Sequence, residues 1–249
     1  MKALAATLAL IALGGCAASG DIRQPIPTQH VAAPQTAQRL VVVLPGRADD
    51  LVALQRSGIA AAIQSAWPDA DVILAALTLP YYRAGDAPQR LHSEIMQPAR
   101  LQGYRSIWLA GASMGGMGTL LYDAAFPGAV DGLVLFAPYL GDTSLLREIR
   151  DAGGVARWQP GPPQPVNADT WQRELWRHLQ TWTSQPAQAQ RVWLTYGDTD
   201  RLRDAMPLLE RVVPPTQVLR REGGHAWSVW SAAAVDVFHA IDAKSAAKP

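Results

Sequence analysis

Cysteine is nearly absent from this chain, whose 249 residues include only Cys16. One thiol excludes a disulfide within the chain and any zinc site built on several cysteines. Charged residues make up only 17% of the chain, and 22 Lys and Arg residues balance 21 Asp and Glu residues. This balance provides no broad basic field for nucleic acid and no acidic block typical of a solvating tail. We therefore expect no nucleic-acid partner.

The chain also lacks an apolar run of membrane-spanning length near its N-terminus. Residues 3–13 are apolar apart from Thr7, whereas a spanning helix needs about 20 such residues. After Met1-Lys2, this short run predicts a signal peptide over residues 1–15. Whether such a signal peptide leads to a lipid-anchored or a freely secreted protein depends on Cys16, the single cysteine that follows it.

Leu13-Gly14-Gly15-Cys16 resembles a bacterial lipobox. The resemblance implies cleavage after Gly15 and lipid on Cys16, which would anchor the protein to a membrane through several acyl chains. Ala17 after the cysteine implies the outer membrane, so we expect a protein of the bacterial cell envelope that faces the periplasm. The alternative is an ordinary secretory signal with an incidental cysteine.

Residues 17–38 are rich in Pro, Ala, Gln, Ser and Thr and show no apolar periodicity. With Cys16 they predict a lipidated, flexible tether over residues 16–38, long enough to let a folded body stand off a bilayer. The remaining residues, 39–249, are expected to form one domain.

The body alternates predicted strands with predicted helices, which is typical of βαβ units. We therefore predict an α/β fold with a mostly parallel, twisted sheet and helices on both faces. Reactive groups in such sheets lie beyond the carboxyl ends of the strands. The predicted strands are 40–44, 72–79, 106–110, 132–136, 192–196 and 217–219, and the predicted helices are 50–66, 88–101 with a possible interruption at Pro98, 114–125, 202–212 and 226–243.

Residues 142–190 do not fit this alternation and are interpreted as an insertion. A Pro and Gly cluster at 159–163 precedes a predicted helix over 170–182 that carries Trp171 and Trp182 on one face. The insertion would lie above the carboxyl ends of the strands, so we expect it to act as a lid or pocket wall that contacts apolar substrate groups. The alternative is that this face is ordinary core.

A candidate nucleophile follows the predicted strand 106–110. The sequence Gly111-Ala112-Ser113-Met114-Gly115 then leads into a predicted helix, and strand, G-x-S-x-G and helix together are typical of a nucleophile elbow. The glycines permit a turn sharp enough to expose the serine hydroxyl. The alternative is a glycine-rich turn in which Ser113 only caps the helix.

With Gly116, Gly118 and the turn Ala124-Ala125-Phe126-Pro127, this segment resembles the α/β-hydrolase superfamily, and in particular the esterase D and feruloyl esterase families. The resemblance covers about residues 39–241 apart from the insertion. It implies an α/β-hydrolase fold and a catalytic order of serine, acid and histidine.

His225 is the predicted general base because, of five histidines, it alone lies in a loop after the last predicted strand. Asp200 is the predicted acid, since it resembles the family pattern G-x-x-D at a strand end. Asp198 is the alternative acid, although it is better suited to an Asx-turn. Asp200 could also serve only as a helix cap.

An oxyanion hole requires two backbone N–H groups. Met114 follows the nucleophile, and Arg47 follows Gly46 as the family's donor follows a glycine, with Ala48 as the alternative. Asp49 and Asp50 are expected to cap the next helix.

These residues predict a serine hydrolase that cleaves a small-molecule or lipid-like carboxylic ester through an acyl-enzyme. No phosphate-binding glycine loop or cluster of metal ligands is apparent, so we expect no cofactor and no metal. Thioesterase, transacylase and peptidase activities share the same fold and triad. A noncatalytic envelope lipoprotein that binds a ligand is the alternative from another class.

Overall fold

The computed structural model describes residues 20–246. Its seven strands form one sheet in the order β1-β3-β2-β4-β5-β6-β7, in which only β1 runs antiparallel to its neighbour. The strands are β1 (Thr28–Val31), β2 (Arg39–Leu44), β3 (Ala70–Ala75), β4 (Ser106–Ala112), β5 (Gly132–Phe136), β6 (Val192–Gly197) and β7 (Val218–Arg221).

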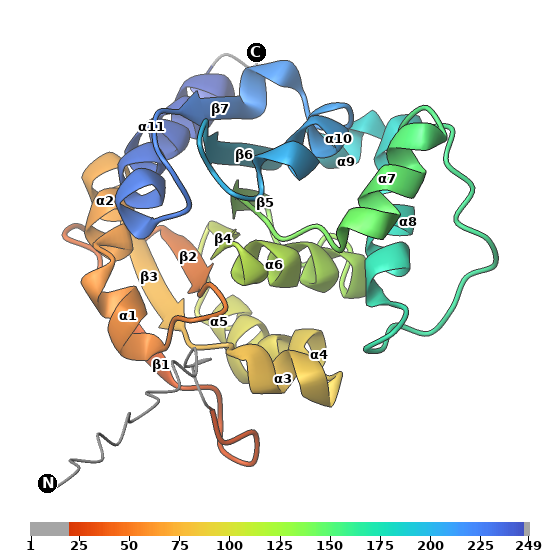
Figure 1. Cartoon of the computed structure of the whole chain (residues 1–249). Coiled ribbons are helices and arrows are strands. Elements are labelled where there is room, and N and C mark those ends of the chain that lie inside the picture. The colour runs from red at the N-terminus through yellow and green to blue at the C-terminus, as the bar shows by residue number, and fades with distance from the viewer. Residues whose placement is uncertain (1–19, 247–249) are drawn as a thin grey trace, which may run out of the picture.

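Helices cover both faces of the sheet (Figure 1). On one face α11 packs against α2, and on the other α6 lies between α4 and α8. The helices are α1 (Leu51–Arg56), α2 (Ile59–Ala66), α3 (Leu79–Ala84), α4 (Ala87–Leu91), the π-helical turn η1 (His92–Met96), α5 (Gln97–Arg100), α6 (Met114–Ala125), α7 (Thr143–Asp151), α8 (Trp171–Ser184), α9 (Pro186–Ala189), the 3-10 turn η2 (Arg203–Ala205), α10 (Met206–Glu210), the 3-10 turn η3 (Pro215–Gln217) and α11 (Trp227–Ala246).

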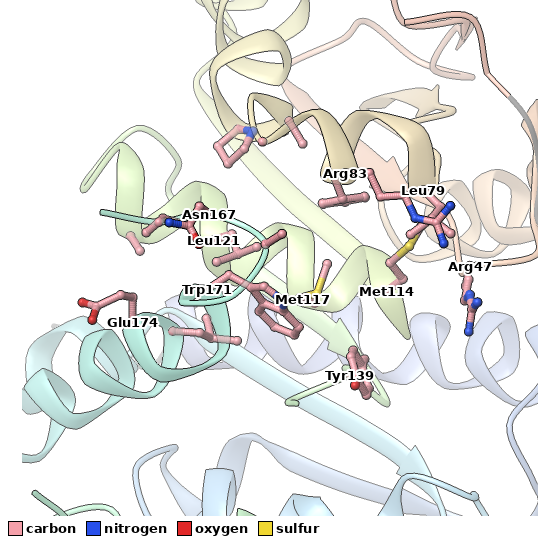
Figure 2. A pocket seen from close by; sticks show the side chains of 18 of the residues that line it. Arg47, Leu79, Arg83, Met114, Met117, Leu121, Tyr139, Asn167, Trp171 and Glu174 are labelled. Atoms are coloured by element: carbon pink, nitrogen blue, oxygen red, sulfur yellow. The ribbon is translucent and has the colours of Figure 1, made fainter. Parts of the chain in front are cut away.

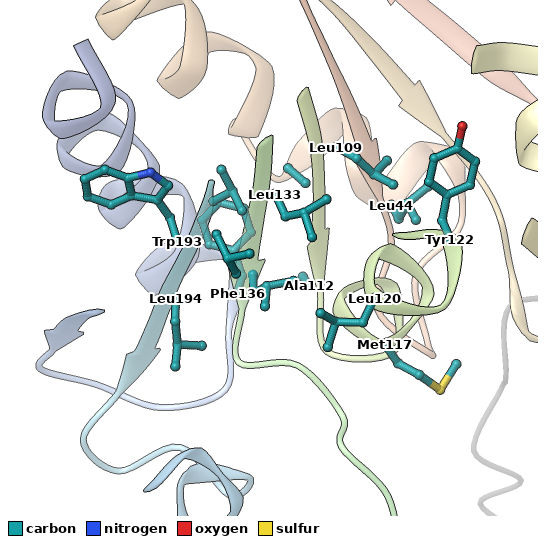
Figure 3. Packing of buried hydrophobic residues seen from close by; sticks show 14 of the residues in the cluster. Leu44, Leu109, Ala112, Met117, Leu120, Tyr122, Leu133, Phe136, Trp193 and Leu194 are labelled. Carbon is teal, nitrogen blue, oxygen red and sulfur yellow. The ribbon is translucent and has the colours of Figure 1, made fainter. Parts of the chain in front are cut away.

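The central strands of the sheet are buried. Every residue of β2 and β5 is buried, because helices cover both of their faces, which explains the apolar runs at 40–44 and 132–136. Figure 3 shows their side chains packed with those of β4, β6 and α6, including Leu109, Leu133 and Leu120. This packing fixes the carboxyl ends of β4 and β6, where the candidate site residues follow.

The predicted tether is wrong for its second half. Residues 28–31 form the edge strand β1, which pairs with β3 in the register Thr28 with Ala75. Ile26 is buried and its N–H donates to the carboxylate of Glu94 at 2.7 Å. Backbone hydrogen bonds to β3 create this strand, so a polar sequence with little periodicity gave no sign of it. Cys16 and the predicted signal peptide lie outside the described residues.

Three predicted elements differ most from the observed ones. The helix expected over 50–66 divides into α1 and α2 at Gly58, whose φ of 74° lies in the left-handed region. The strand expected over 72–79 ends at Ala75, and α3 begins at Leu79. The helix expected over 202–212 is only a 3-10 turn followed by α10, Met206–Glu210.

Pro98 does not interrupt the helical stretch from α4 to α5. A proline ring inside a helix collides with the carbonyl four residues earlier, here that of Glu94. The π-helical turn η1, His92–Met96, contains Glu94 and widens the helix there, so the chain continues into α5.

Candidate active site

Ser113 stands on a strained turn between β4 and α6. Its φ of 54° and ψ of −112° lie in a backbone region that residues other than glycine rarely adopt. Its N–H donates to the Phe136 carbonyl at 2.8 Å, and its carbonyl accepts from the Tyr139 N–H at 2.9 Å. These bonds hold the turn from both sides, although Ser113 itself caps no helix with its hydroxyl.

The two glycines of the elbow are required by close backbone contacts. A Cβ on Gly111 would lie 2.2 Å from the carbonyl oxygen of Gly115. A Cβ on Gly115 would lie 2.4 Å from the carbonyl oxygen of Leu44 at the end of β2. Any side chain at either position would push α6 away from the sheet and move Ser113 with it.

His225 lies after β7 and is held by a buried carboxylate. Its Nδ1 is 2.8 and 2.9 Å from the two carboxylate oxygens of Asp200, which is fully buried. The Asp200 carboxylate also accepts the Leu202 N–H at 2.7 Å, and the Trp230 ring packs edge-on against the imidazole at 4.7 Å. These contacts fix the orientation of the ring.

The second ring nitrogen of His225 is the notable atom. Its Nε2 is buried and has no hydrogen-bond partner among residues 20–246. A buried polar atom without a partner is costly, and such atoms occur where a site awaits a substrate or performs chemistry. With Nδ1 on Asp200, Nε2 is the nitrogen that remains able to accept a proton.

Asp198 has a different place from Asp200. One of its carboxylate oxygens accepts the Gly223 N–H at 2.9 Å, and its own N–H donates to the Arg221 carbonyl at 2.7 Å. It therefore joins the loop after β6 to the loop that carries His225, while Asp200 alone of the two contacts the imidazole. Between the two carboxylates considered from the sequence, the geometry selects Asp200 as the partner of the histidine.

The predicted oxyanion donors lie on the wall of the cavity that contains Ser113. Met114 is the first residue of α6, where the N–H has no partner within the helix. Arg47 follows β2 in the chain and also lines this cavity, whereas Ala48 does not. Both segments approach from the carboxyl ends of adjacent parallel strands.

Asp49 was expected to cap a helix, and this expectation is wrong. Asp50 is the residue that caps α1, through the Ala53 N–H at 2.8 Å. Asp49 instead accepts the Gly46 N–H at 3.0 Å and the indole N–H of Trp227 at 2.9 Å. It ties the loop of Arg47 to the start of α11, a link between residues far apart in sequence that no local pattern could reveal.

A cavity of about 560 Å³ opens beside Ser113 (Figure 2). One wall is a stripe of α6 that runs from Met114 through Met117 and Leu121 to Ala124 and Ala125. At 1.5 Å per residue this stripe is about 16 Å long. The cavity therefore offers an apolar trough that begins at the candidate nucleophile.

Helix α8 supplies the opposite wall of the cavity. Trp171 and Leu175 of α8 line it, and Figure 2 shows Trp171 facing Met117. The prediction that Trp182 also lines the pocket is wrong, because Trp182 is only 1% exposed and packs in the core. Eleven residues make about three helical turns, so both tryptophans lie on the same face of α8 but about 16 Å apart along its axis, Trp171 at the cavity and Trp182 in the core.

A buried ion-pair network fastens α8 to α6. Asp123 of α6 is 1% exposed, its carboxylate lies 3.0 Å from Nε2 of His178, and Arg191 donates to it as well. Burial alone would raise the pKa of Asp123, but His178 and Arg191 outweigh burial and lower it. The contact between His178 and Asp123 thus joins α8, which carries Trp171, to α6.

The described residues contain neither a cluster of metal ligands nor a helix of membrane-spanning character. Within residues 20–246 no three His, Cys, Asp or Glu side chains gather so as to hold a metal ion. No helix in the same range has the length and apolar character needed to cross a membrane.

Comparison with known protein families assigns the chain to one of them. Residues 89–240, more than half of the chain, match the family described as "Putative esterase". The chain belongs to this esterase family. The matched region contains Ser113, Asp200 and His225. No curated protein matches the chain in sequence.

Solved structures of the same fold include several hydrolases. Est1E from Butyrivibrio proteoclasticus, also solved with ferulic acid bound, superimposes with a TM-score of 0.60 at 13% identity over 89% of this chain and 93% of its own. The S-formylglutathione hydrolase FrmB from Staphylococcus aureus gives 0.57 at 15% identity over 88% and 98%. A monoacylglycerol lipase from Paleococcus ferrophilus gives 0.55 at 13% identity over 87% and 99%. The predicted α/β-hydrolase fold is confirmed.

Proposed function

We propose that this member of the esterase family is a serine hydrolase that cleaves carboxylic esters through an acyl-enzyme. The observation that carries the proposal is the His225 imidazole, whose Nδ1 is held by buried Asp200 while its buried Nε2 has no partner among the described residues. An imidazole fixed in this way is suited to accept a proton from a serine hydroxyl. Ser113 precedes α6 at the same edge of the sheet.

The reaction would begin when Ser113 Oγ attacks the ester carbonyl and its proton passes to Nε2 of His225. The negative oxygen of the tetrahedral intermediate would be bound by the N–H groups of Met114 and Arg47. Collapse breaks the bond to the alcohol, which leaves with the proton from His225. Water then repeats the sequence on the acyl-enzyme, releasing the acid and restoring Ser113.

The cavity indicates the acyl half of the substrate. Its apolar trough along α6, closed by Trp171, is suited to an alkyl or aromatic acyl group. The ferulic acid bound to Est1E is consistent with an aromatic group in a cavity of this fold. We therefore expect a small-molecule or lipid-like ester whose acyl group extends away from Ser113.

A fluorophosphonate probe tests the enzymatic part of the proposal. Wild-type protein should be labelled, and Ser113→Ala should lose both labelling and the hydrolysis of p-nitrophenyl esters while remaining folded. A folded wild-type protein that neither reacts with the probe nor hydrolyses any ester or thioester would favour a noncatalytic ligand-binding role.

Trp171 and Trp182 form a matched pair for testing the acyl trough. Across p-nitrophenyl esters from acetyl to dodecanoyl, Trp171→Ala should change the ratio of kcat/KM for long against short chains, since a methylene in a close-fitting pocket is worth about 1 to 3 kcal/mol. Trp182→Ala should reduce stability and leave that ratio unchanged, because Trp182 is core. Equal profiles in both variants would place the acyl group elsewhere.

We further propose that Cys16 anchors the protein to the outer membrane, on the strength of its lipobox-like context. Cys16→Ser should then move the protein from the membrane pellet to the soluble fraction without changing kcat/KM, because the anchor is far in sequence from Ser113. Ser113→Ala serves as the control and should stay in the pellet. Continued pelleting of Cys16→Ser would contradict the anchor.

A further inference from the structure

Three exposed arginines line the cavity without an acidic partner. Arg47, Arg83 and Arg201 all belong to its wall, and no carboxylate among residues 20–246 forms an ion pair or hydrogen bond with them. The wall contains one carboxylate, that of Glu174, which is bound by Arg177 at 2.8 Å. The cavity wall therefore carries three guanidinium groups that form no ion pair with a carboxylate among residues 20–246.

The positive charge is concentrated at the Ser113 end. Arg47 follows the glycine of the predicted oxyanion loop, and Arg201 directly follows Asp200. Figure 2 shows Arg47 and Arg83 beside Met114, whereas Glu174 lies at the other end of the cavity.

The field of Arg47 also reaches Tyr139, whose backbone N–H is bonded to the Ser113 carbonyl. Burial and the hydrogen bond to Asp142 raise the pKa of Tyr139 to about 12, and Arg47 acts in the opposite direction. This places the Arg47 guanidinium within electrostatic reach of the nucleophile's immediate surroundings.

The cavity thus has two chemically different parts. The α6 wall beyond Met117 is apolar, with Glu174 and Asn167 at the far end of the cavity, and the end near Ser113 is cationic. An ester bound with its carbonyl at Ser113 and its acyl chain in the trough would place its alcohol half among the arginines. A guanidinium remains charged at any physiological pH and matches the geometry of carboxylate and phosphate oxygens.

We propose that Arg47, Arg83 and Arg201 form a subsite for an anionic group, a carboxylate or a phosphate, on the alcohol half of the ester. This inference rests on the proposed ester hydrolysis and extends it to a substrate class: esters of an apolar acid with an anionic alcohol. Unpaired arginines around one opening repel one another, and a bound anion relieves that repulsion. They would also attract anionic substrates from solution.

Matched substrate pairs test this subsite. The carboxylate pair is para-octanoyloxybenzoate and its methyl ester, and the phosphate pair is octanoylglycerol phosphate and octanoylglycerol. The acyl group is the same throughout, so the readout is the kcat/KM ratio of anionic to neutral ester, divided by the same ratio for alkaline hydrolysis to remove differences in intrinsic reactivity.

Wild-type protein should favour the anionic ester of at least one pair about tenfold, and Arg83→Gln and Arg201→Gln should each reduce the ratio about threefold. The preferred pair identifies the anion. Added salt should weaken the preference. Arg105→Gln is the matched control. This exposed arginine directly precedes β4, at the end of the strand opposite to Ser113, so the substitution should leave the ratio unchanged.

A wild-type ratio near one for both pairs, or a ratio that neither Arg83→Gln nor Arg201→Gln changes, would overturn the subsite while ester hydrolysis stands. If the folded wild-type protein hydrolyses none of the four esters and does not react with a fluorophosphonate, the proposed function fails and the subsite fails with it. The two failures are therefore distinguishable.

Discussion

Replacement of alanine by glycine at position 113 should cost less stability than the same replacement in unstrained backbone, although Ser113→Ala and Ser113→Gly both remove activity. Residue 113 has φ 54° and ψ −112°, a conformation that costs a residue with a Cβ about 1 to 3 kcal/mol and glycine almost nothing. The Ser113 hydroxyl makes no hydrogen bond within residues 20–246, so its removal in Ser113→Ala should change stability little.

The magnitude follows from a matched substitution elsewhere in the elbow strand. Ala110 of β4 is fully buried in extended backbone, and Ala110→Gly loses a methyl worth about 0.8 kcal/mol and gains unfolded-chain entropy worth about 0.4 to 1 kcal/mol. The same two losses apply when alanine at 113 becomes glycine, but relief of strain opposes them there. The difference between the two alanine-to-glycine effects should therefore equal the strain, about 1 to 3 kcal/mol.

Urea unfolding followed by tryptophan fluorescence measures this difference. Ser113→Ala, Ser113→Gly and the double variant Ser113→Ala with Ala110→Gly are compared at equal m-values, so that changes in midpoint report changes in stability. In thermal unfolding each 1 kcal/mol corresponds to roughly 2 to 4 °C for a domain of this size. If alanine-to-glycine at 113 destabilises the protein as much as it does at 110, the turn at Ser113 stores no backbone strain.

Three further substitutions test contacts around the site. Asp200→Asn should lower kcat by about four orders of magnitude, because the asparagine would hold the imidazole in the wrong tautomer. Asp198→Ala should lower kcat less than tenfold and mainly loosen its loop. The reverse order in steady-state kinetics would make Asp198 the acid. Asp49→Ala should lower kcat more than it changes KM, because the Gly46 N–H loses its acceptor, and unchanged kinetics would show that the loop holds its shape alone. Asp123→Asn should cost about 3 to 5 kcal/mol at neutral pH. Since the pKa of Asp123 is lowered on folding, its stabilisation is present above the unfolded pKa near 3.9 and is lost as pH falls through the lower folded value, so the urea midpoints of wild type and variant should converge in acid.

The strands near the middle of the sheet could be predicted from the sequence because burial on both faces produces a run of consecutive apolar residues. Strands buried on both faces are predominantly apolar, and the predicted bounds of β2, β5 and β6 agree with the observed bounds within one residue. The edge strand β1 was missed, since its stability comes from backbone bonds to β3 rather than from its own side chains.

Within the site, the elbow was readable because its demands fall on consecutive residues. Glycine is the only residue that fits at 111 and 115, where the backbones of β2, β4 and α6 come together. The motif around Ser113 therefore consists of five consecutive residues and can be recognised in the sequence. His225 was placed by its loop after the last strand. From the sequence, Asp200 was preferred to Asp198 because of a family resemblance. In the structure the loop after β6 meets the loop after β7, and this contact brings Asp200, not Asp198, to the imidazole of His225.

The sequence by itself determined the strand and helix alternation, the elbow and the identity of the groups able to perform chemistry, because each depends on neighbours along the chain. Only the tertiary structure decided which aspartate meets His225, that Asp49 holds the Gly46 loop to Trp227, and that Trp171 rather than Trp182 faces the cavity. These are contacts between segments as much as 178 residues apart. Their geometry is fixed by how the helices pack on the sheet, and no local pattern encodes that packing.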